Sequence, residues 1–510
     1  MTGVTGRDIS WSGDFSIAMW VEVPQDRPGA AGTLASKFDP VARRGFTLAA
    51  ISGGGGYSGP GDDLRISFGV DAGTEPKWFD CGHPSRTSKY VSNSLTVFAG
   101  DLYAATSDAE DDAGKAHVFR YLGEQDWEDL GKITPLNAHG VGPMIVHEES
   151  LYAGTWNYDW TRVDSQDLDP CRVYRFDGPE RWVDCGQPGA SSRLFGLASH
   201  DGKLYAVGDD FSVQVYRGGQ EWEQVRLLTT YAHPMTVDGG RLVLGTLDPA
   251  SVWAFDGEGW EDLGNPLGSQ ERSSQLHSFV DFRGSLHTGT WPLGGVAGRD
   301  AETGEWIDRG RLGDSTEVNA LLMYNGKMYG GALPRAEVFR YDEGEDWTSI
   351  RRFNERPDWQ PIPVAQVEAA DDGDVRVREW GRVTSLTEHD GLLFASTGNS
   401  TSAFVDEGYE PLGGVYAMRA GAVATTANSI SAGWHHVVAS REQGVLSVFI
   451  DGARAATSRH MLVSSVETAV PLTTGAGESG AFSGRIEEVR VVGHALDDVE
   501  IKALLATRPA

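Results

Sequence analysis

The alternation of apolar and polar positions repeats along most of this chain. Each repeat reads as an apolar strand, a tight turn, a second strand such as "LYAGT", a third such as "VYRFDG", and a closing "W-x-D-x-G". The spacings between successive second strands are 49, 53, 38, 44, 42 and 65 residues, and the residues that open these strands are Leu102, Leu151, Leu204, Leu242, Leu286, Met328 and Leu393. Four short strands per unit at this period are typical of a β-propeller, so the pattern predicts seven blades.

The repeat also predicts how the ring closes. Six repeats end in an outer-strand tryptophan: Trp127, Trp182, Trp222, Trp260, Trp306 and Trp347. The seventh repeat lacks this tryptophan, and the missing phrase, "KWFDCGHP" (77–84), stands before the first repeat. We expect residues 77–84 to supply the outer strand of the last blade, because shared backbone hydrogen bonds would remove an open sheet edge.

Strand-like segments flank the propeller on both sides. Before it, Phe15, Ile17, Met19 and Val21 alternate as in a half-buried strand, and strands follow at 32–39, 45–52 and 63–70. After it come 433–456, 471–476 and 482–501. Neither flank closes a core by itself, but together they offer about 160 residues, the size of one sandwich domain.

These flanks resemble a laminin-G-like, concanavalin-type jelly roll. The matching phrases are "FSIAMWV" (15–21), "GWHHVV" (433–438) before "FIDG" (449–452), and "FSGRIEEVRVVGHALDDVEI" (482–501). The resemblance implies an all-β chain in which a seven-bladed β-propeller is inserted into a concanavalin-like, laminin-G-like β-sandwich. The expected division is 1–75 and 423–510 for the two parts of the sandwich and 76–422 for the propeller.

Charge and cysteine content narrow the classes of function. The net charge is −30, which excludes a nucleic-acid partner in the absence of a basic patch. No apolar run approaches membrane-spanning length, and the N-terminus has neither a basic region nor an apolar stretch, so we expect a cytoplasmic protein or one whose leader was removed. Cys171 and Cys185 flank a predicted hairpin turn, where two reduced thiols are favoured over a disulfide, and Cys81 is expected to pack in the closing strand.

Candidate chemistry gathers just before the innermost strands, at one end of the predicted central channel. Several blades contribute polar side chains there: Tyr90, Asn93, His139, Arg193, Tyr231, His233, Gln275, His277, Glu317, Asn319, Arg382 and Thr384. A merely structural lip would favour Ser, Thr, Gly and Ala. Loops on the same face add aromatic residues suited to stacking on sugar rings, namely Trp156, Tyr158 and Trp291.

This lip is similar to that of seven-bladed propeller polysaccharide lyases and their rhamnosyl-glucuronate-cleaving relatives. The resemblance is one of architecture and residue type, and it implies β-elimination on a uronic-acid sugar. Arg193 would then neutralise the uronate carboxylate, His277 would be the base, and Tyr231 or His233 the acid. The expected substrate-binding residues are His139, Trp156, Tyr158, Trp291, Glu317, Asn319 and Arg382.

Two other functions remain open. One is a non-catalytic module that binds glycans or proteins, since both folds serve widely as binding platforms. The other is a glycoside hydrolase, which would need a carboxylate pair, whereas Glu317 is the one carboxylate at the lip. We expect no cofactor; a structural calcium ion is possible, although no oxygen-rich loop points to one.

Overall fold

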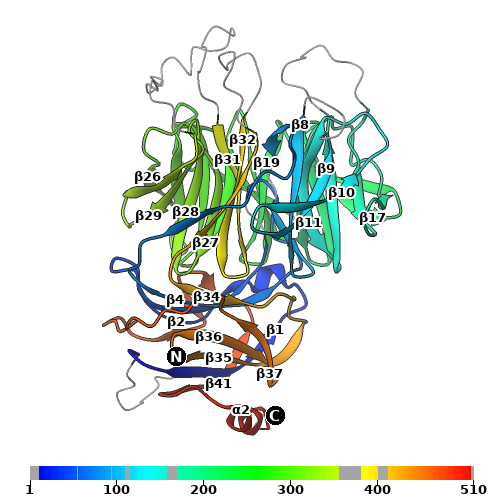
Figure 1. Cartoon of the computed structure of the whole chain (residues 1–510). Helices are drawn as coiled ribbons and strands as arrows, with labels where there is room; N and C mark the ends of the chain where they lie inside the picture. The colour runs from blue at the N-terminus through cyan, green and yellow to red at the C-terminus, as the bar shows by residue number, and fades with distance from the viewer. Residues whose placement is uncertain are drawn as a thin grey trace.

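The computed structural model describes residues 11–53, 56–92, 95–109, 115–157, 169–354, 381–399 and 412–506. Over these residues the chain is built almost entirely from β-strands, with one α-helix, α2 (Asp498–Leu505), and one short turn of 3₁₀-helix, η1 (Pro28–Ala30). Neither helix is long and apolar enough to cross a membrane. Figure 1 shows a ring of sheets standing on a smaller sandwich. The predicted fold class, a seven-bladed propeller inserted into a concanavalin-like sandwich, is confirmed.

The sandwich is assembled from the two ends of the chain. One sheet has the strand order β37-β36-β35-β1-β41, and the other has the order β34-β4-β3-β2-β40-β39, with β38 also paired to β2. Their bounds are β1 Phe15–Val23, β2 Gly32–Asp39, β3 Arg44–Ile51, β4 Arg65–Ala72, β34 Ala422–Thr425, β35 Gly433–Glu442, β36 Val445–Ile450, β37 Ala453–Thr457, β38 Thr473–Thr474, β39 Ala476–Gly477, β40 Gly480–Ala481 and β41 Arg485–Val492.

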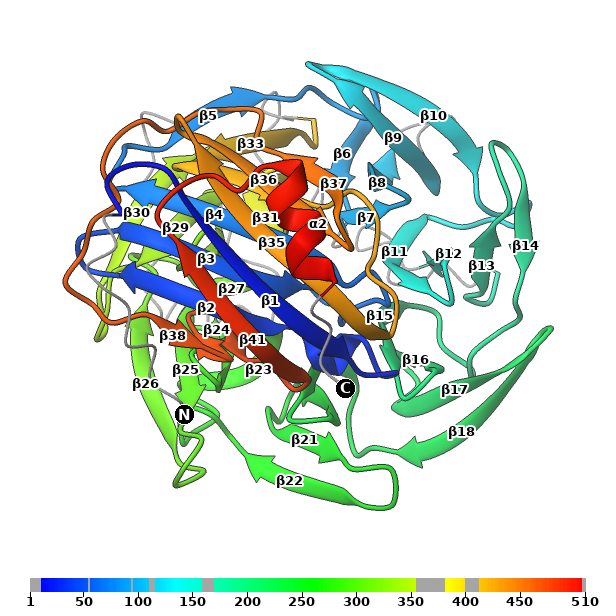
Figure 2. The ribbon, with the colours of Figure 1, turned by 90° about the horizontal axis from the view of Figure 1, so that it is seen from below.

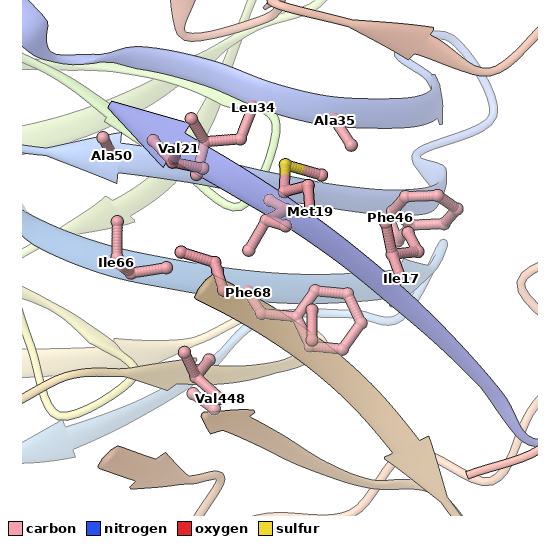
Figure 3. Packing of buried hydrophobic residues seen from close by; sticks show 14 of the residues in the cluster. Ile17, Met19, Val21, Leu34, Ala35, Phe46, Ala50, Ile66, Phe68 and Val448 are labelled. Carbon is pink, nitrogen blue, oxygen red and sulfur yellow. The ribbon is translucent and has the colours of Figure 1, made fainter. Parts of the chain in front are cut away.

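The core of the sandwich lies between these two sheets. Side chains of β1 such as Ile17 and Met19 meet Phe46 and Phe68 from the facing sheet, and all four are fully buried (Figure 3). The sequence predicts a half-buried β1, but the structure buries both of its faces. The reason is α2, whose Ile501 packs with Leu496 over the outer face of β1 and its neighbours.

The propeller contains seven blades, each running from an inner to an outer strand. In chain order the inner-to-outer sets are β7–β10, β11–β14, β15–β18, β19–β22, β23–β26, β27–β30 and β31–β33 with β5. Seen from below in Figure 2, the sandwich lies in front of the ring of sheets.

The propeller strands have the following bounds. The first three blades consist of β7 Thr96–Phe98, β8 Asp101–Ala109, β9 His117–Gly123, β10 Asp126–Lys132, β11 Gly140–His147, β12 Ser150–Trp156, β13 Val173–Phe176, β14 Trp182–Asp184, β15 Leu194–His200, β16 Lys203–Gly208, β17 Ser212–Gly218 and β18 Glu221–Leu227. The next two consist of β19 Ala232–Asp238, β20 Arg241–Thr246, β21 Val252–Phe255, β22 Trp260–Gly264, β23 Ser273–Phe282, β24 Ser285–Pro292, β25 Gly295–Arg299 and β26 Trp306–Arg311. The last two consist of β27 Glu317–Tyr324, β28 Lys327–Leu333, β29 Glu337–Tyr341, β30 Trp347–Arg352, β31 Gly381–His389, β32 Leu392–Asn399, β33 Val415–Arg419 and β5 Lys77–Asp80.

Backbone pairing joins the first and last blades. Strand β5 lies antiparallel to β33, with Asp80 opposite Tyr416, so the seventh blade takes its outer strand from the start of the propeller. Strand β6 (Ser88–Val91) pairs with β8 and bridges to β32. The repeated tryptophans also tie blades together: Trp127, Trp222, Trp306 and Trp347 each donate the indole N–H to a backbone carbonyl at or next to the preceding outer strand, over 2.8 Å.

The inner strands end against the sandwich. At this lower end Arg65 of β4 pairs with Glu388 of β31, and the Nδ2 atom of Asn325 donates to the carbonyl of Val70. The thiols of Cys81, Cys171 and Cys185 are buried and free, so the predicted reduced state of Cys171 and Cys185 is what the structure has.

Candidate functional site

The upper end of the channel, where the inner strands begin and which lies away from the sandwich, gathers the polar residues. We call this site the channel mouth and define it by Arg193, Tyr231, His233, His277, Glu317, Asn319 and Arg382. Arg193 and Tyr231 stand immediately before β15 and β19, while the other five lie in the first residues of β19, β23, β27 and β31. All inner strands start at the same end of the ring, so residues at the same position of different repeats converge there.

His277 is held by hydrogen bonds on both ring nitrogens. Its Nδ1 atom lies 3.2 Å from the hydroxyl of Tyr57 and 3.4 Å from Oε1 of Glu317, and its Nε2 atom lies 3.2 Å from Oε1 of Gln275. Gln275 in turn donates from Nε2 to Asp248 over 2.6 Å. Burial lowers the pKa of His277, against the opposing charge of Glu317, so its neutral form is favoured.

His233 occupies a different environment. Its ring lies 3.8 Å from that of Phe195, 4.7 Å from that of Tyr57 and 5.4 Å from that of His277. The residue is 8% exposed, and neither ring nitrogen has a hydrogen-bond partner within the described part of the chain. Burial, followed by the charges of His277, Arg193 and Arg382, lowers the pKa of His233 well below its usual value. This side chain is therefore a neutral imidazole with unengaged nitrogens.

Two arginines supply the positive charge of the channel mouth. The Nη1 atom of Arg382 lies 3.8 Å from Oε1 of Glu317. Burial works against the charge on Arg382, but Tyr90 and Glu317 outweigh it and the pKa of Arg382 is raised. Arg193 lies 3.4 Å from Asp209, with its guanidinium carbon 5.0 Å from the ring centre of Phe195. Arginine side chains carry a positive charge in proteins.

Aromatic rings lead from the channel mouth outward. Phe195 contacts Trp156 at 5.8 Å and Tyr231 at 5.9 Å, and Tyr231 stacks on Phe211 at 5.8 Å. Phe211 is 39% exposed, unusual for a phenylalanine, so the series ends at the surface.

The remaining predicted residues lie at or beyond the edge of this cluster. The partly exposed His139 donates its backbone N–H to the carbonyl of Trp156, and Trp291 pairs with Gln275 between β24 and β23. Tyr158 and Asn93 lie outside the described residues.

Sequence reasoning missed four residues of the site: Tyr57, Phe195, Asp209 and Asp248. The two aspartates carried a usable signal, because each follows the second strand of its blade within two residues. Phe195 lies two positions after Arg193, as the second residue of β15. No repeat pattern could indicate Tyr57, since it comes from the sandwich part of the chain.

Comparison with known proteins finds one family model that covers part of the chain. Residues 363–502 match the family model of the concanavalin A-like lectin/glucanases superfamily. In the structure this range includes strands β31 to β33 of the last blade and omits β1 to β4, which complete the sandwich. No curated protein matches the chain.

Solved structures with a similar fold are remote in sequence. A catalytically inactive virginiamycin B lyase from Staphylococcus aureus, solved with quinupristin, is 7% identical with a TM-score of 0.48, covering 68% of this chain and 99% of its own. A streptogramin B lyase is 9% identical with a TM-score of 0.46, covering 68% and 97%. YCF48 from Cyanidioschyzon merolae is 9% identical with a TM-score of 0.43, covering 67% and 98%. Likenesses this distant carry no information on activity.

Proposed function

We propose that the channel mouth is the active site of a lyase that cleaves a uronic-acid-containing poly- or oligosaccharide by β-elimination. The observation that carries this proposal is His233: a buried, neutral imidazole without hydrogen-bond partners among the described residues, within the electrostatic reach of Arg193 and Arg382. A buried polar group without a partner costs free energy. A ligand that binds it would recover that cost.

The chemistry needs three groups. Arg193 and Arg382 hold the uronate carboxylate and stabilise the negative charge that develops when the adjacent carbon loses its proton. His233 takes that proton as the base. The electron pair forms a carbon–carbon double bond, the glycosidic carbon–oxygen bond breaks, and the departing oxygen receives a proton from the hydroxyl of Tyr231, whose ring lies 6.1 Å from that of His233.

This proposal exchanges the roles that the sequence suggested for the two histidines. His277 makes hydrogen bonds through both nitrogens and is 3% exposed, so it fits an orienting role better than direct contact with substrate. His233 has unengaged nitrogens. His139, Trp156 and Trp291 stay in the proposal as sugar-positioning residues at the rim. Tyr158, which lies outside the described residues, stays in it on the sequence alone.

The charge of the substrate strengthens the proposed base. In the free protein, burial and two nearby guanidinium groups disfavour the imidazolium form of His233. A bound carboxylate would neutralise these guanidinium charges and raise the pKa of His233 toward its ordinary value. A neutral sugar would not, so the site would discriminate by charge.

A second candidate function is a non-catalytic glycan-binding module. The match of residues 363–502 to a superfamily of lectins and glucanases favours it, as does the low exposure of both histidines. A glycoside hydrolase fits less well, because Glu317 already faces His277 and Arg382.

The test is incubation of the purified protein with a panel of uronic-acid polysaccharides, followed by ultraviolet absorbance of the unsaturated product. We expect absorbance from at least one uronate, none from the matched neutral polysaccharides, and loss of the signal in Arg193→Met. New reducing ends without absorbance would indicate hydrolysis. Binding by calorimetry without either product would overturn the lyase proposal in favour of the binding module.

A further inference from the structure

A loop of the sandwich enters the propeller channel from below. Residues 56–62, here called the plug, lie between β3 and β4 and make backbone hydrogen bonds to three blades. Gly59 donates to Leu197 over 2.8 Å, Asp62 donates to Val146 over 2.9 Å, and Met235 donates to Tyr57 over 3.2 Å. The plug is thus held like an additional strand segment across the lower half of the channel.

The fit of the plug depends on two glycines. A Cβ atom on Gly59 would lie 2.9 Å from Cβ of Ala198, and one on Gly61 would lie 2.7 Å from the carbonyl oxygen of Val146. Real Cβ atoms do not approach backbone this closely, so the plug can advance this far only with glycine at these positions.

The plug delivers Tyr57 to the channel mouth. The residue is 3% exposed, and its ring lies 4.7 Å from His233 and 5.7 Å from His277. Its hydroxyl lies 3.2 Å from Nδ1 of His277 and 3.2 Å from Oδ1 of Asn319.

The direction of the hydrogen bonds around His277 follows from Asp248. An ionised carboxylate only accepts, so Gln275 must turn its amide nitrogen toward Asp248 and its oxygen toward Nε2 of His277. Nε2 therefore carries the proton of the neutral imidazole, and Nδ1 is an acceptor.

The hydroxyl of Tyr57, 3.2 Å from Nδ1 of His277, is placed to donate its proton to this acceptor. This direction requires the amide of Asn319 to be turned, so that Nδ2 rather than Oδ1 lies 3.2 Å from the phenol oxygen and donates to it. The result is a directed chain of hydrogen bonds from Asn319 through Tyr57, His277 and Gln275 to Asp248.

We infer that Tyr57 is a positioning residue which the sandwich supplies to the propeller site, where its hydroxyl fixes His277 in the neutral form protonated on Nε2. The catalytic consequence of this role rests on the proposed lyase function. The role itself does not: it is a property of the resting protein, and it makes the sandwich part of the site.

Several groups face His277 and decide the outcome of removing the hydroxyl. Glu317 on β27 lies 3.4 Å from Nδ1, His233 lies on the neighbouring inner strand β19, Arg382 lies on β31 two blades away, and Asp248 acts through Gln275. In Tyr57→Phe, Nδ1 loses its donor, and a proton on Nδ1 gains Glu317 as an acceptor. The protonated form of His277 is therefore favoured, and we expect its pKa to rise.

The experiment is an NMR titration of the full chain with isotopically labelled histidine, in which His277→Gln identifies the resonances of His277. Tyr324→Phe is the matched control, because Tyr324 is equally buried and its hydroxyl also donates a hydrogen bond, to Gly391, away from the channel mouth. We expect Tyr57→Phe to change the nitrogen shifts and raise the pKa of His277, while Tyr324→Phe leaves both unchanged at a similar melting temperature.

An unchanged tautomer and titration of His277 in Tyr57→Phe would overturn the inference. This readout needs no substrate, so the two proposals fail separately. If no uronate is cleaved but His277 responds as expected, the lyase proposal falls and the role of Tyr57 stands. If cleavage is observed and the titration of His277 is unchanged, the lyase proposal stands and the role of Tyr57 falls.

Discussion

Histidines lie at both ends of the propeller's inner strands, but their surroundings differ. At the lower end, Nδ1 of His147 lies 2.9 Å from the hydroxyl of Ser199 and 3.4 Å from Asp62 of the plug, and His200 lies 3.4 Å from Asp26. At the upper end, His233 and an oxygen of Glu317 have no hydrogen-bond partner in the described ranges. The histidines at the lower end thus lie beside carboxylates of the sandwich, whereas His233 at the channel mouth lies among aromatic rings and near two arginines.

The difference indicates how structural and functional polar residues are separated in this molecule. Burying a polar group costs about 1–3 kcal/mol unless a hydrogen bond compensates for it. At the lower end, His147 is bonded to Ser199 of the propeller and lies beside Asp62 of the sandwich, so this contact stabilises the docking of the two domains. At the upper end, the proposed function assigns the compensation for His233 to a bound substrate.

The largest expected effect distinguishes His233 at the channel mouth from His147 at the lower end. His233→Gln should lower turnover of a uronate substrate by about 10²–10⁴-fold with little change in melting temperature, because it removes the proposed base. His147→Gln should retain turnover but cost about 1–3 kcal/mol of stability, because Ser199 and Asp62 lose the imidazole that contacts both of them. Steady-state kinetics and calorimetry on both variants check this. If His233→Gln destabilises the fold and retains activity, the comparison is wrong.

The next effect concerns the buried ion pair at the lower end. Arg65, 3% exposed, lies 3.3 Å from Glu388 and also donates to the carbonyl of Glu388. Arg65→Met leaves a buried carboxylate without its cation and should cost about 3–5 kcal/mol in the free energy of unfolding.

The control for this variant is a more exposed pair at the same boundary. Arg459 of the sandwich pairs with Asp390, two residues after Glu388. Arg459→Met should cost about 1 kcal/mol or less in chemical denaturation. Equal costs for the two variants would show that the lower end is not held by its buried charges.

Most of this architecture could be predicted from the sequence. The repeat with its outer tryptophans predicts the blades, because each blade buries the same positions. The flanking phrases predict the sandwich. Helix α2 was not foreseen, although its capping box of Asp497 and Glu500 is visible in the sequence.

The residues of the channel mouth could be predicted from the sequence only where they stand at repeated positions of the blades. His233, His277, Glu317 and Arg382 occupy equivalent places before or at the start of inner strands, so a register argument brings them together. Tyr57 lies more than 170 residues before either of the two histidines that it contacts, and it belongs to the other domain. Its position follows from the docking of the sandwich, which no local pattern encodes.

A smaller effect concerns the pH dependence of the lower end. Asp281 lines a cavity of about 140 Å³ between the sandwich and the propeller, together with Asp238. Burial, followed by the charge of Asp238, raises the pKa of Asp281 to about 7. Between about pH 4 and pH 7 the folded state keeps a proton on Asp281 that the unfolded state releases. The free energy of unfolding therefore falls as the pH rises through this range.

Asp281→Asn should consequently stabilise the protein at about pH 8, on the order of 2 kcal/mol, and have little effect below about pH 3, where the carboxyl group is protonated in both the folded and the unfolded state. Thermal melts of the variant and the parent across this range measure it. A uniform loss of stability at all pH values would mean that the carboxylate is needed for its hydrogen bond to Gly284 rather than tolerated at a cost.

The smallest effect lies at the outer limit of the channel mouth. Phe211 stacks on Tyr231 with their ring planes 19° apart and is 39% exposed, so its outer face is free for a sugar ring. Phe211→Ala should raise KM about three- to tenfold without changing kcat, since stacking contributes roughly 0.5–1.5 kcal/mol to binding.

Phe79 provides the matched control for this stacking. It is 42% exposed but belongs to the outer strand β5, on the circumference of the propeller rather than at the channel mouth. Phe79→Ala removes the same amount of exposed ring and should leave KM unchanged. If both variants raise KM equally, Phe211 does not contact substrate, and the site ends at the residues within the channel.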